Sequence, residues 1–165
     1  MSPKQRLPFA QWAEIQRTDR FISIEPLSGY SLLQREDSGW IAYFEPHATD
    51  DALGVGLLLT LGQSRYVRPD DEPEFLTPDR YARCYRRWQR DFMRRYGYEK
   101  LQDAYATMDW CRAKRSAGTI SIQSHKRDAP EYFWDLPPDR TLVIPETTDD
   151  AVVGAALRLA LDRCE

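Results

Sequence analysis

The sequence predicts a single α/β domain of the α+β kind, in which a mostly antiparallel sheet carries two repeat-related helices and a third helix that bridges them. Three observations predict this fold. An apolar helix pattern occurs twice, short strand patterns precede each copy in the same order, and an arginine-rich helix pattern lies between the copies. A chain of 165 residues can bury one ordinary hydrophobic core, so we expect residues 1–165 to form one domain.

The internal repeat is clearest in the two apolar helices. Residues 53–65 read LGVGLLLTLGQSR, and residues 153–165 read VGAALRLALDRCE. Landmarks upstream of the helices recur in the same order: Trp12, Arg17, Ile-Ser-Ile at 22–24 and Pro46 in the first copy, and Trp110, Arg115, Ile-Ser-Ile at 120–122 and Pro145 in the second. We therefore expect a pseudo-duplication with repeat-like halves at about 9–65 and 107–165, each built as strand, turn, strand, irregular stretch, strand and helix.

Both halves contain short runs rich in β-branched and aromatic residues, which we interpret as antiparallel strands joined by turns. In the first half the strands are 21–25, 30–34 and 40–45, with turns at 26–29 and 37–39. In the second half they are 107–115, 119–123 and 140–144, and the first two form a hairpin. A helix follows each set, and in the first half Thr49 or Asp50 can cap it. Small residues near each helix start allow the helix to approach a neighbouring surface, which we expect to be the sheet. They are Gly54, Gly56, Ala155 and Ala156, and Gly54 is matched by Gly154 in the repeat.

A linking helix is predicted at about 77–97, because Thr77 is a good cap, proline suits the first helical position and Gly97 can end the helix. Its aromatic residues recur at helical spacing along one stripe: Tyr81, Tyr85, Trp88, Phe92 and Tyr96. Its arginines fall on the opposite arc: Arg80, Arg83, Arg86, Arg87, Arg90 and Arg94. We therefore expect one buried aromatic face and one solvated arginine face.

The net charge of −3 is unevenly distributed along the chain. Residues 77–100 contain eight Lys or Arg and three Asp or Glu, so this segment carries +5 and the rest of the chain carries −8. Acidic runs are usually solvated loops, but on a small domain they can also steer a basic protein partner. The candidate binding residues, chosen from charge alone, are Asp70, Asp71, Glu72, Glu74, Glu36 and Asp37.

Composition also bears on location and redox state. The longest apolar run, residues 55–61, is far too short to span a bilayer, and residues 1–8 lack the apolar stretch of a signal peptide. We therefore expect a cytoplasmic protein without membrane contact. The three cysteines, Cys84, Cys111 and Cys164, are odd in number and widely spaced, which argues against a disulfide framework and against a zinc site.

No sequence pattern indicates catalysis, a metal site or a cofactor site. The two histidines, His47 and His125, are interpreted as ordinary surface residues. A cysteine-dependent enzyme stays open as an alternative, because the fold could bring Cys111 and His125 together, yet no third group that would orient such a pair is evident. We expect a protein that is not an enzyme and that has no catalytic residue, metal or cofactor.

The arginine face of the linking helix supports a second alternative. Guanidinium groups neutralise phosphates and stack on bases, so a nucleic-acid-binding regulatory protein could use Arg83, Arg87, Arg90 and Arg94. The acidic balance of the chain, with a pI near 5.5, favours a solvated face that pairs with the acidic remainder of the molecule. We therefore expect no direct contact with nucleic acid.

Four stretches together resemble a known family. They are ISIEPLSGYSLLQ at 22–34, TDDALGVGLLLTLGQSR at 49–65, the linking helix with its final Tyr-Gly-Tyr at 96–98, and LVIPETTDDAVVGAALRLALDRC at 142–164. In these stretches, which extend over nearly the whole chain, the sequence is similar to the CdiI-type immunity proteins of bacterial contact-dependent growth inhibition (CDI) systems. The shared patterns indicate packing rather than chemistry.

The resemblance implies a function as an antidote. Proteins of this family form a heterodimer with the C-terminal toxin domain of a very large exported protein, and many such toxins are nucleases that act on transfer RNA. A nuclease that grips phosphates is basic, so an acidic inhibitor could cover its active site without any catalytic residue. The contact residues are not carried over from the family, because its recognisable motifs lie in the scaffold.

Overall fold

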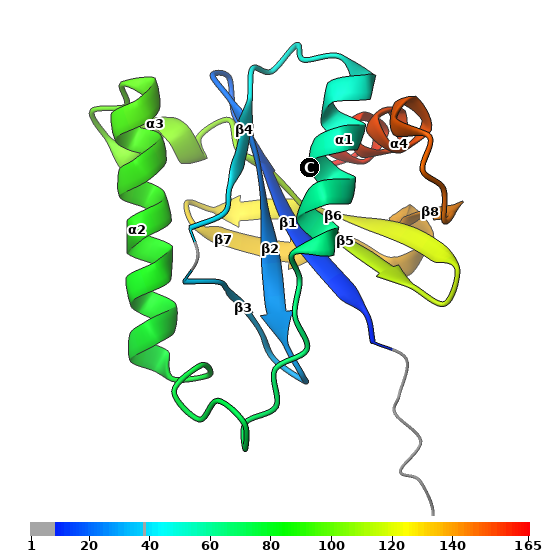
Figure 1. Cartoon of the computed structure of the whole chain (residues 1–165). Helices are drawn as coiled ribbons and strands as arrows, with labels where there is room; N and C mark the ends of the chain where they lie inside the picture. The colour runs from blue at the N-terminus through cyan, green and yellow to red at the C-terminus, as the bar shows by residue number, and fades with distance from the viewer. Residues whose placement is uncertain (1–8, 38) are drawn as a thin grey trace, which may run out of the picture.

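The computed structural model describes residues 9–37 and 39–165 and contains one curled sheet with helices on both faces (Figure 1). The first half contains β1 (Gln11–Arg17), β2 (Ile22–Gly29), β3 (Leu33–Arg35), β4 (Ala42–Phe44) and α1 (Asp50–Gly62). The linking segment contains α2 (Pro78–Tyr96) and α3 (Leu101–Tyr105). The second half contains β5 (Asp109–Ser116), β6 (Thr119–Ala129), β7 (Tyr132–Asp135), the 3-10 helix η1 (Pro138–Arg140), β8 (Leu142–Pro145) and α4 (Asp150–Asp162).

The order of the strands follows the repeat in the sequence. β1 and β5 pair antiparallel at the centre of the sheet, and β2 and β6 flank them. Both β3 and β4 then pair with β2, while β7 and β8 pair with β6. Each half therefore contributes a hairpin, two short outer strands and a helix, which confirms the predicted antiparallel sheet and pseudo-duplication.

The two repeat helices pack on one face of the sheet and against each other. Leu53, Leu57 and Leu61 of α1 are fully buried in one cluster with Val153 and Leu157 of α4. A Cβ atom on Gly54 would lie 1.8 Å from the carbonyl oxygen of Asp150, and one on Gly154 would lie 1.7 Å from that of Asp50. The expectation that these glycines face the sheet is therefore wrong, because the backbone they approach belongs to the other repeat helix.

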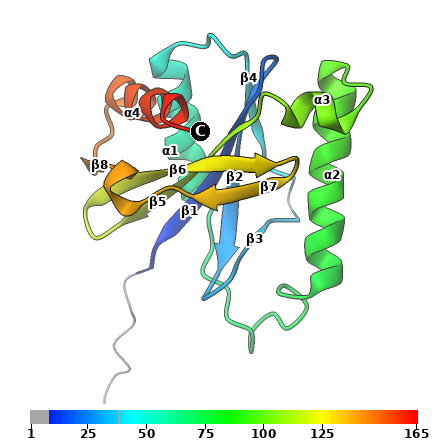
Figure 2. The ribbon, with the colours of Figure 1, turned by 180° about the vertical axis from the view of Figure 1, so that it is seen from behind.

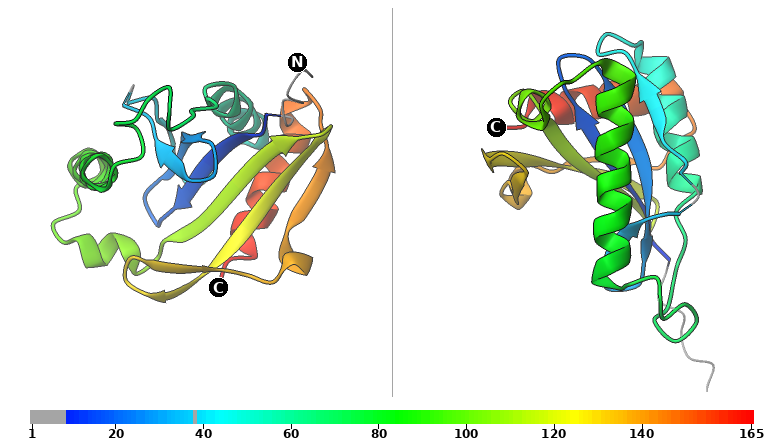
Figure 3. Two further views of the ribbon diagram at one scale, coloured as in Figure 1. Left: turned by 90° about the horizontal axis from the view of Figure 1, so that it is seen from below. Right: turned by 90° about the vertical axis from the view of Figure 1, so that its left-hand side faces the viewer.

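The linking helix lies away from both repeat helices (Figures 2 and 3). Trp88 and Phe92 of α2 pack against Phe21 and Trp110 in a second cluster, on the face of the sheet opposite α1 and α4. The predicted bridge between the repeat helices is therefore wrong. The aromatic stripe of α2 explains the placement, since Trp88 and Phe92 pack in one cluster with Phe21, Tyr98 and Trp110.

The predicted helix ends are confirmed, whereas some strand boundaries differ. The side chain of Thr49 caps α1, that of Thr77 caps α2, and Gly97 ends α2 with a left-handed φ of 70°. The predicted turn at 26–29 is part of β2, which continues to Gly29 because its residues keep pairing with β1 and then with β3. The strands β1 and β7 and the helix α3 were not predicted. Within the described residues, no helix is long and apolar enough to cross a membrane.

Candidate functional site

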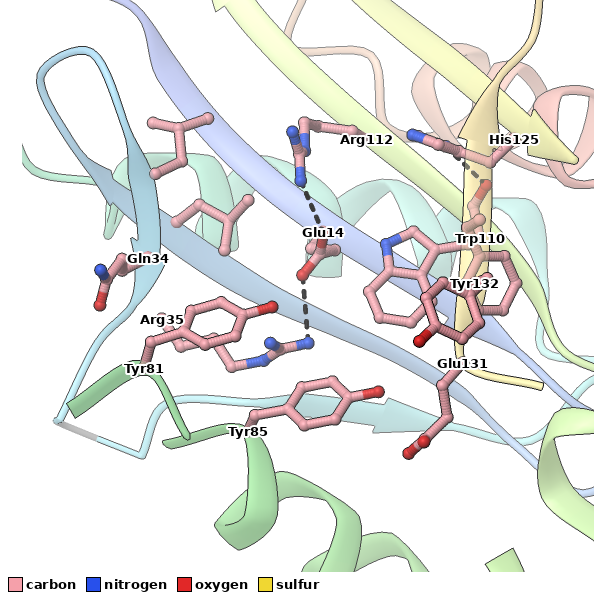
Figure 4. A pocket seen from close by; sticks show the side chains of 13 residues that line it. Glu14, Gln34, Arg35, Tyr81, Tyr85, Trp110, Arg112, His125, Glu131 and Tyr132 are labelled. Carbon is pink, nitrogen blue, oxygen red and sulfur yellow. Dashed lines mark hydrogen bonds and ion pairs between the residues drawn. The ribbon is translucent and has the colours of Figure 1, made fainter. Parts of the chain in front are cut away.

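A polar cavity lies on the face of the sheet that carries α2 (Figure 4). Strand alternation creates it: Ala13 and Ile15 of β1 point toward α1 and α4, so Glu14 between them points the other way. The cavity measures about 370 Å³ and extends from the sheet to Tyr81 and Tyr85 of α2. A concave site with a few convergent polar groups is the usual form of a binding pocket.

Four charged side chains form a network at this cavity; Glu14, Arg35 and Arg112 line it, and Glu25 joins them through Arg35. Arg35 lies 3.1 Å from Glu14 and 2.6 Å from Glu25, and Arg112 lies 3.0 Å from the second oxygen of Glu14. Figure 4 shows Arg35 and Arg112 approaching Glu14 from opposite sides. The side chains of Glu14, Glu25 and Arg35 are each about 5–6% exposed, so water contributes little to their solvation.

The network shifts the pKa values of its two carboxyl groups in opposite directions. Burial raises the pKa of Glu25 to about 7, because Arg35 offsets only part of the lost hydration and the nearby charge of Glu14 raises the pKa further. Burial would also raise the pKa of Glu14, but Arg35 and Arg112 together lower it. Burial alone would lower the pKa of Arg35, but the carboxylates of Glu25 and Glu14 raise it by more. The guanidinium group therefore stays charged.

Sequence reasoning did not find this network. The available signal was the presence of Glu25 between Ile24 and Leu27 in a run that is buried throughout. A carboxylate at such a position requires a cation, yet the sequence does not show which of the many arginines supplies it. The pairing becomes visible only once the register of β1, β2, β3 and β5 is known.

The structure brings the two predicted acidic segments together. The guanidinium of Arg65 lies 2.6 Å from Glu36 and 2.8 Å from Glu72, so it joins the 36–37 turn to the segment after α1. Arg80 of α2 lies 3.0 Å from Asp37. We call the surface formed by residues 36–37 and 70–74 the acidic surface.

The six predicted residues differ in how free their carboxylates are. The side chain of Glu36 is only 10% exposed and forms an ion pair with Arg65. Glu72 also pairs with Arg65, but its side chain is 45% exposed. Burial would raise the pKa of Asp37, but hydrogen bonds from Arg80 and Cys84 and the charges of Arg80 and Arg83 together lower it. Three residues of the acidic surface are exposed and pair with neither Arg65 nor Arg80: Asp70, Asp71 and Glu74.

The predicted arginine face is only partly solvated. Arg80 is 5% exposed and stacks 4.0 Å from the ring centre of Phe75, whereas Tyr81, expected to be buried, is 50% exposed. Arg87 donates to the carbonyl oxygens of the 36–37 turn. The exposed arginines of α2 are Arg83, Arg86, Arg90, Arg94 and Arg95.

The structure excludes the nucleophilic pair that the sequence left open. Cys111 pairs with Ser124 in the sheet and is buried in the α1–α4 cluster, whereas the next residue, His125, points to the opposite face and lines the cavity. Burial lowers the pKa of His125, and its ring lies 3.0 Å from the carbonyl oxygen of Trp110 and 2.9 Å from Asp135. His125 is thus not the surface residue that we expected. In the described part of the chain, no three His, Cys, Asp or Glu side chains form a metal site.

Solved structures of other proteins share this fold, and two of them cover nearly the whole chain. A chain of the CdiA-CT/CdiI toxin and immunity complex from Yersinia pseudotuberculosis superposes with a TM-score of 0.86 at 22% identity, over 95% of this chain and 98% of that one. The protein of unknown function NMB0488 from Neisseria meningitidis superposes with a TM-score of 0.89 at 20% identity, over the full length of both chains. At these identities the likeness concerns the fold.

Sequence comparison identifies the family. The immunity protein CdiI-YPIII of Yersinia pseudotuberculosis serotype O:3 (strain YPIII) is 26% identical over 168 residues, which cover 93% of this chain and 95% of the relative. The family model CdiI, described as CDI immunity protein, matches residues 11–164. Because that match extends over nearly the whole chain, the protein belongs to the CdiI family of CDI immunity proteins.

Proposed function

We propose that this protein neutralises a cognate CDI toxin domain by binding it in a heterodimer in the cytosol, without catalysis of its own. The match to the CdiI family over residues 11–164 carries the proposal. A structural neighbour is part of a CdiA-CT/CdiI toxin and immunity complex, which supports the same kind of partner for this chain. Binding alone suffices for inhibition when the inhibitor covers the site where the substrate must enter.

We propose that the acidic surface faces the toxin and that the toxin is a nuclease acting on transfer RNA. A nuclease holds phosphates with basic residues, so its active site is electrostatically complementary to an acidic inhibitor. Asp70, Asp71 and Glu74 supply exposed charge, while Arg65 and Arg80 fix the two segments relative to each other. Such a preorganised surface lowers the entropic cost of association.

The test is a triple charge reversal, Asp70→Lys, Asp71→Lys and Glu74→Lys, which leaves the Arg65–Glu72 pair intact. With the toxin domain encoded beside this gene, we expect association at low salt to slow by about tenfold or more, because exposed charges act on the encounter rate. Growth protection and the association rate are the readouts, and added salt should reduce the difference.

The matched control is Glu99→Lys, Asp103→Lys and Asp139→Lys, which makes the same change in net charge at exposed residues outside the acidic surface. This control should associate close to the wild-type rate. If both triple variants slow association equally, net charge and not the acidic surface steers the encounter. If neither does, the acidic surface lies outside the interface.

A second candidate function rests on the exposed stripe of Arg86, Arg90 and Arg94 along α2. A row of exposed guanidinium groups is typical of a surface that binds nucleic-acid phosphates, although Arg94 also lies 3.8 Å from Asp91. If this face binds RNA, the free protein is retained on RNA with a steep salt dependence, and reversal of the three charges abolishes retention. Retention that is absent at low salt removes this candidate.

A further inference from the structure

Two of the three cysteines lie side by side in the fold, although their positions in the sequence are far apart. The Sγ atoms of Cys111 and Cys164 are 3.5 Å apart, and both thiols are free. Cys111 lies on the central strand β5 and is fully buried, whereas Cys164 follows α4 and is partly exposed. One thiol of the pair is therefore within reach of a small solute.

The end of the chain holds the two thiols together. The amide of Glu165 donates to the carbonyl oxygen of His125, and the amide of Arg127 donates to the carbonyl oxygen of Glu165, so the chain end pairs with β6. The carboxylate of Glu165 also lies 3.2 Å from Arg140. These contacts hold residue 165 against β6, and the amide of Cys164 donates to the carbonyl oxygen of Leu161 in α4. Cys164 is therefore held next to Cys111 by both the sheet and the helix.

We propose that Cys111 and Cys164 form an oxidative modification site, in which a peroxide converts the two thiols into a disulfide that joins the C-terminus to the centre of the sheet. A disulfide requires sulfur atoms about 2.05 Å apart. The helix α4 ends at Asp162, two residues before Cys164. A small rotation of the Cys164 side chain and of this short segment can therefore bring the two sulfur atoms from 3.5 Å to bonding distance without moving the helix. The proposal does not depend on toxin binding.

The chemistry proceeds in two balanced steps. The Cys164 thiol first releases its proton, and the resulting thiolate attacks hydrogen peroxide. The O–O bond breaks to give a sulfenic acid on Cys164 and a hydroxide ion, which takes up the released proton and leaves as one water molecule. The sulfur of Cys111 then attacks the sulfenic sulfur, so that an S–S bond forms and a second water leaves with the thiol proton. The pair loses two electrons and two protons, which peroxide accepts.

The surroundings favour this order of steps. The hydrogen bond between the two sulfur atoms lowers the pKa of the Cys164 thiol, whereas burial raises the pKa of Cys111. The thiolate is the reactive form, so the exposed member of the pair is also the more reactive one. The third cysteine, Cys84, is 2% exposed, donates to Asp37 and lies on α2 at the opposite face of the sheet.

The experiment counts thiols in the folded protein after mild treatment with hydrogen peroxide. In denaturant, Ellman's reagent should titrate three thiols before treatment and one after it, and the intact mass should fall by two hydrogen atoms. A non-reduced digest should contain one peptide pair that joins Cys111 to Cys164. The oxidised protein should melt about 5–10 °C higher, because the link closes a long loop of the chain.

Two variants separate this site from other oxidation. Cys84→Ala should still lose two thiols and gain thermal stability, whereas Cys164→Ser should keep both remaining thiols and show no increase in melting temperature. The proposal is overturned if the folded wild type keeps three thiols at a peroxide concentration that oxidises the urea-unfolded chain. It is equally overturned if the digest joins Cys84 to a partner or if only intermolecular disulfides form.

Discussion

The two faces of the sheet are built from different chemistry. Under α1 and α4 the strands present alanine, isoleucine and cysteine, and the two helices touch through reciprocal glycines. The α2 face carries aromatic rings around the buried charges of Glu14, Glu25 and Arg35. The positions that match in the repeat also diverge on this face, since Glu14 in β1 corresponds to Arg112 in β5, and the two form an ion pair. The repeat therefore specifies a symmetric scaffold on one face, and the other face is free to differ.

The largest expected effect sharpens the contrast between buried and exposed charge. Arg35→Met leaves Glu25 buried without its ion-pair partner, and we expect the free energy of unfolding to fall by about 3–5 kcal/mol. Arg65 also binds two carboxylates, but its side chain is 48% exposed, so Arg65→Met should cause a much smaller loss. Urea denaturation of both variants measures the difference. Equal losses would show that burial of the cavity network does not matter for stability.

The next effect concerns the helix face. Gly54→Ala and Gly154→Ala each place a methyl group within 1.8 Å of a backbone carbonyl oxygen of the other helix, so the helices must separate. We expect a loss of about 3 kcal/mol in the free energy of unfolding, at the upper end of overpacking effects. Gly62→Ala is the control, because nothing lies within 4 Å of its added methyl group. That variant should be neutral or slightly stabilised, and a loss as large as that of Gly154→Ala would contradict the proposed contact between α1 and α4.

How much of each face could be predicted depends on how far apart in the sequence the interacting residues lie. Capping by Thr49 and Thr77 is local, since each side chain reaches an amide three residues further along, and both caps were predicted. The repeat also predicted that Gly54 and Gly154 have the same role, although not that each faces the other helix. The charge network could not be predicted, because Arg35 and Arg112 meet Glu14 only through strand register. The two acidic segments were found separately, and only the position of Arg65 between them shows that they form one surface.

The smallest expected effect tests the cavity network through pH. The pKa of Glu25 is raised to about 7 in the folded protein, compared with about 4.5 for an ordinary glutamate. Between these values the folded state binds more protons than the unfolded state, so the contribution of Glu25 to stability is present at low pH and is lost as pH rises toward 7. Glu25→Gln cannot titrate and keeps an oxygen that can accept from Arg35. The wild type should therefore lose about 2 kcal/mol relative to Glu25→Gln between pH 5 and pH 7.

Denaturation of both proteins across this pH range measures the effect as a difference of two curves, which cancels the titration of groups that the proteins share. A difference that stays constant would mean that Glu25 is ionised throughout and that Arg35 alone compensates for its burial. A difference that grows in favour of the wild type as pH rises would require a lowered pKa, as expected for a carboxylate in a dominant ion pair. The sign of the slope therefore distinguishes a buried carboxyl group that burial keeps protonated from one that its arginine keeps charged.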